Sequence, residues 1–218
     1  ALTGGGAGVY NNINGAVNAY MAGGSAKTGA ITIKATDDSK AESDVGTVSI
    51  AGSVAGASVG ASITENVIHN DISSYVDSPV TAGGNVQVIA DSTAQVIGDA
   101  YATSVSVGLF GATGAGGEAR STISGKTQAY IGSSGDIEAA GHAVSIQSSA
   151  DRLADTEVDV VAVFAGAAGA AIGVALADST VNATTEAYIA GAVPTASSLT
   201  VQAADTSRAE SEAFAVAG

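Results

Sequence analysis

The 218-residue sequence contains no cysteine and no tryptophan, and it contains only two prolines. The absence of cysteine excludes disulfides, thiol catalysis and cysteine-ligated zinc or iron–sulfur sites. Aromatic residues make up 4% of the chain and charged residues 13%, yet 46% of the residues are hydrophobic. Alanine and valine therefore replace the usual large core residues. We expect a folded protein with a core of small side chains, because a disordered chain would be less hydrophobic and richer in charge.

Basic residues are also scarce. Seven lysines and arginines stand against 21 acidic residues, which gives a formal net charge of −14. Nucleic acid needs a basic surface to displace its counterions, so this balance excludes nucleic acid as a partner, and it disfavours anionic membranes for the same reason. The opening stretch ALTGGGAGVY has neither an initiator methionine nor a basic signal region, so we expect a piece of a longer protein.

A short tyrosine motif recurs four times along the chain. NAYMAG, SSYVDS, QAYIGS and EAYIAG place Tyr20, Tyr75, Tyr130 and Tyr188 at spacings of 55, 55 and 58 residues. A second motif recurs with nearly the same spacing as the tyrosines. Its four copies are ITIKATDDS, VQVIADSTA, VSIQSSADR and LTVQAADTS. Each unit ends at a glycine that follows a short run of small, mostly apolar residues. These glycines divide the chain into units 1–52, 53–108, 109–166 and 167–218. We predict one segment of four tandem repeats.

Within each unit the hydrophobic period is two, which is typical of strands. Stretches such as VQVIADSTAQVIGDAYATSVSVG alternate small apolar and polar residues. Tandem strand-forming units with small interiors predict an all-β fold, a parallel β-solenoid (β-helix). One or two coils per unit would give a rod of roughly 20 to 40 Å. A β-sandwich is the alternative, although a sandwich does not require this repeat.

The longest uncharged run is Val160–Ala177, with eighteen residues. Its counterparts in units two and three contain Ser, Thr, Glu and Arg, which a bilayer core would not accept. The run therefore predicts two buried strands meeting at a glycine-rich turn, and no membrane insertion. The glycine-rich stretches LTGGGAGVY and GATGAGGEA match no phosphate-binding loop, and we interpret both as turns.

Few residues suggest chemistry. His69 and His142 occupy different phases of the repeat, without the neighbours that a catalytic triad or a metal site needs. We expect the acidic residues to lie on a solvated strand face; the most clustered are Asp37, Asp38, Asp151, Asp155, Glu157 and Asp159. The sequence thus predicts no enzyme, no cofactor and no metal site, with weak cation binding by the carboxylates as the alternative.

The four repeated tyrosines would stack as a structural ladder, one rung per unit. The alternative is an exposed stripe that binds a glycan or another surface. The three phenylalanines, Phe110, Phe164 and Phe214, lie near the unit seams and would plug the coil or mark its outer wall. Asn182 begins one Asn-x-Thr glycosylation pattern, a frequency expected by chance in a chain rich in serine and threonine.

The recurring AYI and GNVQV elements and the strand–turn blocks around them resemble the repeat regions of leukotoxin-type filamentous adhesins, large surface proteins of Gram-negative bacteria loosely related to filamentous haemagglutinins. The resemblance covers all four units and implies a parallel β-helix that forms part of a stalk. It brings no catalytic residues. We therefore expect an extracellular or cell-surface spacer whose partners are the neighbouring repeats; the alternative is a module that binds a host glycan or protein.

Overall fold

The computed structural model describes residues 1–218, and the chain is built of strands joined by short turns. None of it forms a helix that could cross a membrane. The strands are β1 (Leu2–Ala22), β2 (Ala26–Thr28), β3 (Ile31–Gly52), β4 (Ala55–Asp77), β5 (Pro79–Ala82), β6 (Val86–Ile131), β7 (Asp136–Glu138), β8 (Ala143–Ile189) and β9 (Ser198–Ala217). The prediction of an all-β fold is confirmed.

All strand pairs are parallel, in the order β1-β4-β6-β8-β9 with β3 beside β6. The register follows the sequence repeat. Leu2 lies beside Ala57, 55 residues later, whereas Val86 lies beside Val144, 58 residues later. Consecutive strands of a sandwich are typically antiparallel, so this parallel arrangement disagrees with the sandwich alternative.

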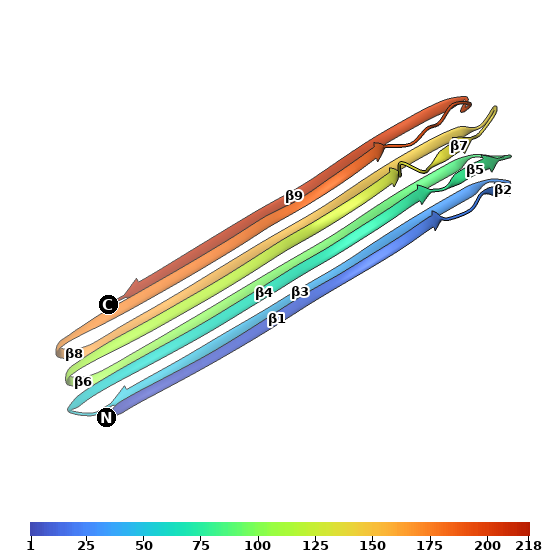
Figure 1. Cartoon of the computed structure of the whole chain (residues 1–218). Helices are drawn as coiled ribbons and strands as arrows, with labels where there is room; N and C mark the ends of the chain where they lie inside the picture. The colour runs from blue at the N-terminus through green and yellow to red at the C-terminus, as the bar shows by residue number, and fades with distance from the viewer.

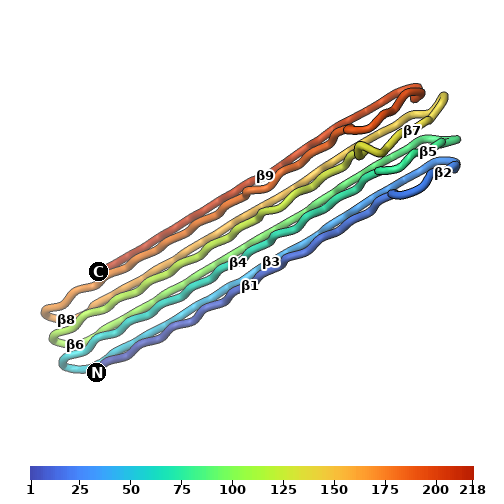
Figure 2. Tube along the Cα trace, viewed as in Figure 1, coloured from blue at the N-terminus to red at the C-terminus, as the bar shows by residue number.

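The sheet forms two walls, because β6 and β8 each reverse direction midway (Figures 1 and 2). Residues 86–107 of β6 pair with β3, whereas residues 110–131 pair with β4. We call β1, β4 and residues 110–131 and 168–189 the tyrosine wall. We call β3, residues 86–107 and 143–163 and β9 the acidic wall. At the end opposite the reversals, β2, β5 and β7 form a separate small parallel sheet.

The two walls face each other through alternate residues. Along β3, every second residue from Ile31 to Ala51 is buried or half-buried, and the residues between them are exposed. Side chains from opposite walls meet directly, as Ser58 Oγ and Ser104 Oγ do at 2.8 Å. Because the walls approach this closely, the interior admits alanine, serine, threonine and valine but few larger residues.

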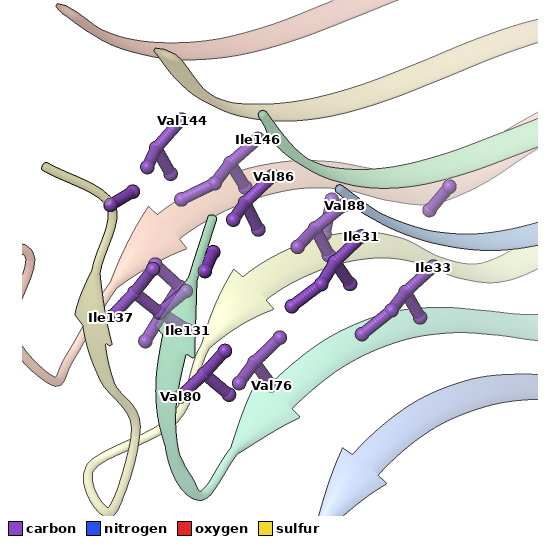
Figure 3. Packing of buried hydrophobic residues seen from close by; sticks show 14 of the residues in the cluster. Ile31, Ile33, Val76, Val80, Val86, Val88, Ile131, Ile137, Val144 and Ile146 are labelled. Carbon is purple, nitrogen blue, oxygen red and sulfur yellow. The ribbon is translucent and has the colours of Figure 1, made fainter. Parts of the chain in front are cut away.

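The largest apolar cluster lies beside the small sheet, where the walls are joined by loops rather than by reversals. There Ile31, Val86, Val88, Ile131 and Ile146 are less than 9% exposed (Figure 3). Two smaller clusters lie further along the walls, one of them around Val158 and Val160. The apolar core is thus concentrated at one end of the strands, and hydroxyl groups fill much of the interior toward the reversals.

The prediction for Val160–Ala177 is only partly correct. The run lies entirely in β8 and reverses direction near Gly166, so it does form two strands and a turn. However, only its first arm is buried, since Val160 and Ala162 are 0% exposed whereas Ile172 is 64% exposed. The second arm is the last strand of the tyrosine wall, and its alternate residues face solvent.

The interpretation of the glycine-rich stretches as turns is wrong. Gly4, Gly6 and Gly8 lie within β1, and Gly114 and Gly116 lie within β6. Of the glycines chosen as unit boundaries, Gly108 and Gly166 are register partners, whereas Gly52 pairs with Val107, one residue before Gly108.

The height of the stack is close to the lower end of the predicted range of roughly 20 to 40 Å, but the strands are much longer than the stack. Each strand step advances one whole repeat, so four repeats stack to about 19 Å, while a 22-residue arm extends about 70 Å. The long dimension of the protein is therefore that of the strands rather than of the stack.

Candidate functional site: the two outer faces

The four predicted ladder tyrosines lie in one stack on the outer face of the tyrosine wall. The ring centroids of Tyr20 and Tyr75 are 5.1 Å apart, and those of Tyr75–Tyr130 and Tyr130–Tyr188 are 4.9 Å apart. Neighbouring rings lie within 7° of parallel. The parallel register produces this arrangement, because each tyrosine is the pairing partner of the next.

Stacking covers the ring faces of the inner tyrosines. Tyr20 and Tyr188 are 60% and 39% exposed, and each has one ring face without a tyrosine neighbour. Burial, helped by the neighbouring Tyr188 and Tyr75, raises the pKa of the Tyr130 phenol. A sugar that stacks on an aromatic residue needs an open ring face. Tyr75 and Tyr130, which have a ring neighbour on both faces, offer a ligand only their ring edges and hydroxyl groups.

A second ladder, made of carboxylates, lies on the outer face of the acidic wall. The register aligns Asp44, Asp99, Glu157 and Glu212 in one row across the four strands of this wall. The rows on either side add further acids, namely Glu42, Asp155, Asp159 and Glu210. A shallow polar groove runs between Glu157 and Glu212.

Burial and mutual repulsion raise the pKa values of two of these carboxylates. Burial, followed by the charges of Asp44, Asp155 and Glu42, raises the pKa of Asp99. The charge of Asp159, with burial and Asp99, raises the pKa of Glu157. The row is therefore an element whose ionisation opposes folding. No group of three or more His, Cys, Asp and Glu side chains has the geometry of a metal site.

Sequence reasoning missed this acidic row. It grouped Asp155, Glu157 and Asp159 as neighbours along the chain, whereas the row joins residues 55 or 58 positions apart. Aligning the four units at a common register would have found it.

The interpretation of Asp37 as a solvated residue is wrong. Asp37 points into the interior, where its carboxylate accepts hydrogen bonds from Asn70 Nδ2 at 3.0 Å and Ser39 Oγ at 2.9 Å. Asp38 and Asp151 are exposed, and Asp155, Glu157 and Asp159 lie on the outward-facing positions of β8. The six acids are thus divided between the interior and the outer face.

The two histidines are not brought together. His69 lies on the tyrosine wall, where its Nδ1 is 2.9 Å from Ser124 Oγ. His142 lies in the turn before β8, and its backbone N–H donates to Ala139. Each makes a local contact within its own part of the stack.

The interior contains one buried charge, Arg152, whose partner Asp205 is partly exposed on β9, and the sequence did not indicate this pair. Arg152, 3% exposed, forms an ion pair with Asp205 and donates to Thr127 Oγ1 at 2.9 Å and Thr185 Oγ1 at 3.1 Å. Burial opposes ionisation of Asp205, but hydrogen bonds from Ser207 and Thr185 and the charge of Arg152 outweigh it and lower its pKa. The strand alternation around Arg152 is the signal that could have placed it inside.

The phenylalanines occupy different environments. Phe164 points inward at the reversal of β8, where its ring lies close to Gly111, Gly166 and Gly169. Phe110 and Phe214 are 59% and 56% exposed. Asn182 is exposed on the outer face of β8. Only Phe164 has the position of a plug.

Comparison with known proteins identifies no relative, since no protein-family model, curated protein or solved structure matches this chain.

Proposed function

We propose that the chain is a structural segment, a β-solenoid in which each repeat forms one coil and the stack acts as a rigid spacer. The observation that supports this most is the parallel register, which pairs each repeat with the next along nearly its whole length. Side chains of one kind recur at one position from coil to coil, as the tyrosines do. An architecture of this type lengthens by adding repeats.

The spacer would belong to a large extracellular or surface-bound bacterial protein, as the resemblance to filamentous adhesins implies. The cysteine-free, acidic composition is compatible with that location. In this role the partners of each coil are the coils above and below it, and no catalytic or cofactor site is required.

Electron microscopy of tandem copies tests the spacer. Four copies of the chain are joined in one polypeptide, with the reversal Ala51–Ala55 repeated at each junction to keep the register. A growing stack predicts plates about 70 Å along the strands and about 77 Å along the stack. Four separate bodies joined like beads would contradict the proposal.

The second candidate function is binding of a host glycan through the tyrosine wall. Exposure of Tyr20 and Tyr188 favours it, whereas the covered ring faces of Tyr75 and Tyr130 do not. A glycan array separates the two functions. A spacer gives no signal, whereas specific binding that is lost on replacing Tyr188 would establish the binding module.

A further inference from the structure

The outer face of the tyrosine wall carries alternating ridges and troughs near the reversals. The ridges are large apolar side chains 49–64% exposed, on β4 (Val59 and Ile63) and on β8 (Ile172, Val174 and Leu176). At the matching positions β1 carries Gly4, Gly6 and Gly8, whereas β6 carries Gly114 and Gly116 and then the charged Glu118. Gly4, Val59, Gly114 and Ile172 form one row, and Gly6, Ala61, Gly116 and Val174 the next. A shallow groove runs over Gly116 between Ile63 and Leu176.

Nothing inside the molecule requires glycine in the central trough. Gly114 and Gly116 do not have a positive φ angle, and a Cβ added to either would meet no atom within 4 Å. Glycine weakens a strand, and where it persists it often marks a place where a ligand or another backbone approaches closely. The open trough therefore points to a partner outside the chain.

We propose that this partner is a second copy of the chain, docked face to face on the tyrosine wall. The two copies are related by a two-fold axis that is parallel to the strands and passes between β4 and residues 110–131 of β6. This operation places the first coil opposite the fourth and the second opposite the third. Val59 of β4 then lies over Gly114 of the other copy, and Ile63 lies opposite Glu118 of the other copy. The ridge of β8 enters the β1 trough of the other copy. The surface is self-complementary, as a two-fold interface must be.

The charges on the same wall agree with this operation. It brings Glu65 opposite Arg120 of the second copy and Asp71 opposite Lys126 of the second copy, because each pair occupies one row on the second and third coils. Within one copy, Arg120 pairs with Glu118 and Asp178, whereas neither Glu65 nor Lys126 forms an ion pair. The backbone N–H of Lys126 donates to Asp71. Each contact between the copies occurs twice in the dimer.

A two-fold axis on the acidic wall would bring like charges together rather than opposite ones. An equivalent two-fold axis would place Asp99 opposite Glu157 and Asp44 opposite Glu212, because these residues share one row. Like charges in direct opposition are destabilising. Of the two outer faces, only the tyrosine wall places opposite charges across such an axis.

The available area is sufficient for a specific dimer. The apolar half alone, four strands wide and eight residues long, covers about 500 Å² per copy, and the full wall covers about 1,300 Å². Specific interfaces bury about 800 Å² per partner. Extended sheets of this kind pack face to face with their strands nearly aligned. The dimer is independent of the spacer role, since it uses an outer face and leaves the coil ends free.

Sedimentation equilibrium of the 218-residue chain tests the trough. The wild-type protein is expected to dimerise, and the double variant Gly114→Val/Gly116→Val is expected to raise the dissociation constant at least tenfold while remaining folded. The matched control is Gly46→Val on the acidic wall, where an added Cβ makes only an ordinary contact with Tyr101 at 3.8 Å. A wild-type chain that stays monomeric at every concentration, or a filled trough that leaves the association unchanged, overturns the proposal.

Charge reversal tests the ion pairs. Lys126→Glu should weaken the dimer and reduce its sensitivity to salt, whereas Lys40→Glu on the acidic wall makes the same change in net charge and should not. Equal effects of both variants would overturn the predicted pairing.

Cysteine cross-linking tests the axis, and the cysteine-free chain makes it specific. Asn12 on the first coil lies opposite Thr180 of the second copy, while within one copy these residues are three coils apart. Oxidation of Asn12→Cys/Thr180→Cys should give a covalent dimer, and Asn12→Cys/Thr184→Cys, shifted by about 13 Å, should not. Cross-linking of both pairs, or of neither, rejects this axis.

Discussion

Single residues in this protein act mainly through what the thin interior can hold. Most inward positions carry alanine, serine, valine or threonine, yet one inward position of β8 carries the buried Arg152. The arginine is tolerated because Asp205 balances its charge and two threonines accept its remaining hydrogen bonds. At the equivalent positions the second coil has Ala94 and Ser92, so an uncharged interior also fits the same backbone.

Removal of one member of this pair should therefore harm the protein more than removal of both. Arg152→Ala is expected to lower the free energy of unfolding by about 2–3 kcal/mol, because it leaves Asp205 and two threonines without their partner. The double variant Arg152→Ala/Asp205→Ser, which copies the second coil, should recover most of that loss. Urea unfolding of the three proteins measures both effects, and a double variant less stable than Arg152→Ala would contradict the explanation.

Gly125 occupies a position that requires glycine, unlike Gly114 and Gly116 in the open trough. Its φ is +111°, and an added Cβ would lie 2.1 Å from the carbonyl oxygen of Asn70 on the adjacent coil. Gly125→Ala should destabilise the fold by at least about 2 kcal/mol, since both the backbone angle and the packing oppose it. Gly116→Ala, measured by urea unfolding of dilute protein, is the matched control and should cost nothing. Equal stability of the two variants would exclude this distinction.

At the scale of the structural element, the tyrosine stack joins the four strands of one wall. Tyr130 has two ring neighbours and Tyr20 has one. Aromatic pairs contribute about 0.5–1.5 kcal/mol beyond burial. Tyr130→Ala should therefore destabilise the protein about twice as much as Tyr20→Ala in urea unfolding. Tyr101→Ala, an outward tyrosine of the acidic wall with no ring partner, serves as the control and should have a smaller effect than either. A larger effect at Tyr101 would disagree with a structural ladder.

The acidic row predicts the pH dependence of stability. Asp99 and Glu157 have raised pKa values in the folded protein, so folding favours their protonated forms. Stability should rise as the pH falls from neutral toward the ordinary pKa values of 3.8 and 4.5. Below 3.8 it should fall again, because the pKa values of Asp91 and Asp205 are lowered in the folded state.

Urea midpoints measured at neutral pH and at about pH 5 check this sign. Asp99→Asn/Glu157→Gln should be more stable than wild type at neutral pH and should show a smaller gain on acidification. Added salt should stabilise the wild type more than the double variant, because it screens the row. A wild-type protein that loses stability between neutral pH and pH 5 would contradict the role of the row.

For the molecule as a whole, the repeat made the pairing of distant segments predictable. The spacing of Tyr75 and Tyr130 gave the register, because a parallel stack places equivalent residues side by side. The dimensions could not be predicted in the same way, since a repeat of this length can form one long coil or two short ones. The glycines of β1 and β6 resembled turns because glycine is common in both turns and open troughs, and only the coordinates show that Gly114 has empty space above it.

The placement of individual side chains depended on strand phase. Asp37 and Arg152 are polar residues at inward positions, and a reading of polarity alone places both in solvent. The acidic row required comparison across four repeats rather than along one. The positions of these side chains therefore follow from how the strands pair in the folded protein and not from local sequence patterns.

The most direct test of the central claim measures whether residues 58 positions apart are neighbours. Gln87 and Ser145 are register partners on the outer face of the acidic wall, away from the proposed dimer contact. Spin labels on Gln87→Cys/Ser145→Cys should show strong dipolar broadening in the electron paramagnetic resonance spectrum. Labels on Gln87→Cys/Leu153→Cys, about 26 Å further along the strand, should not. Narrow spectra from the first pair, or equal broadening from both, would contradict a parallel stack with one repeat per coil.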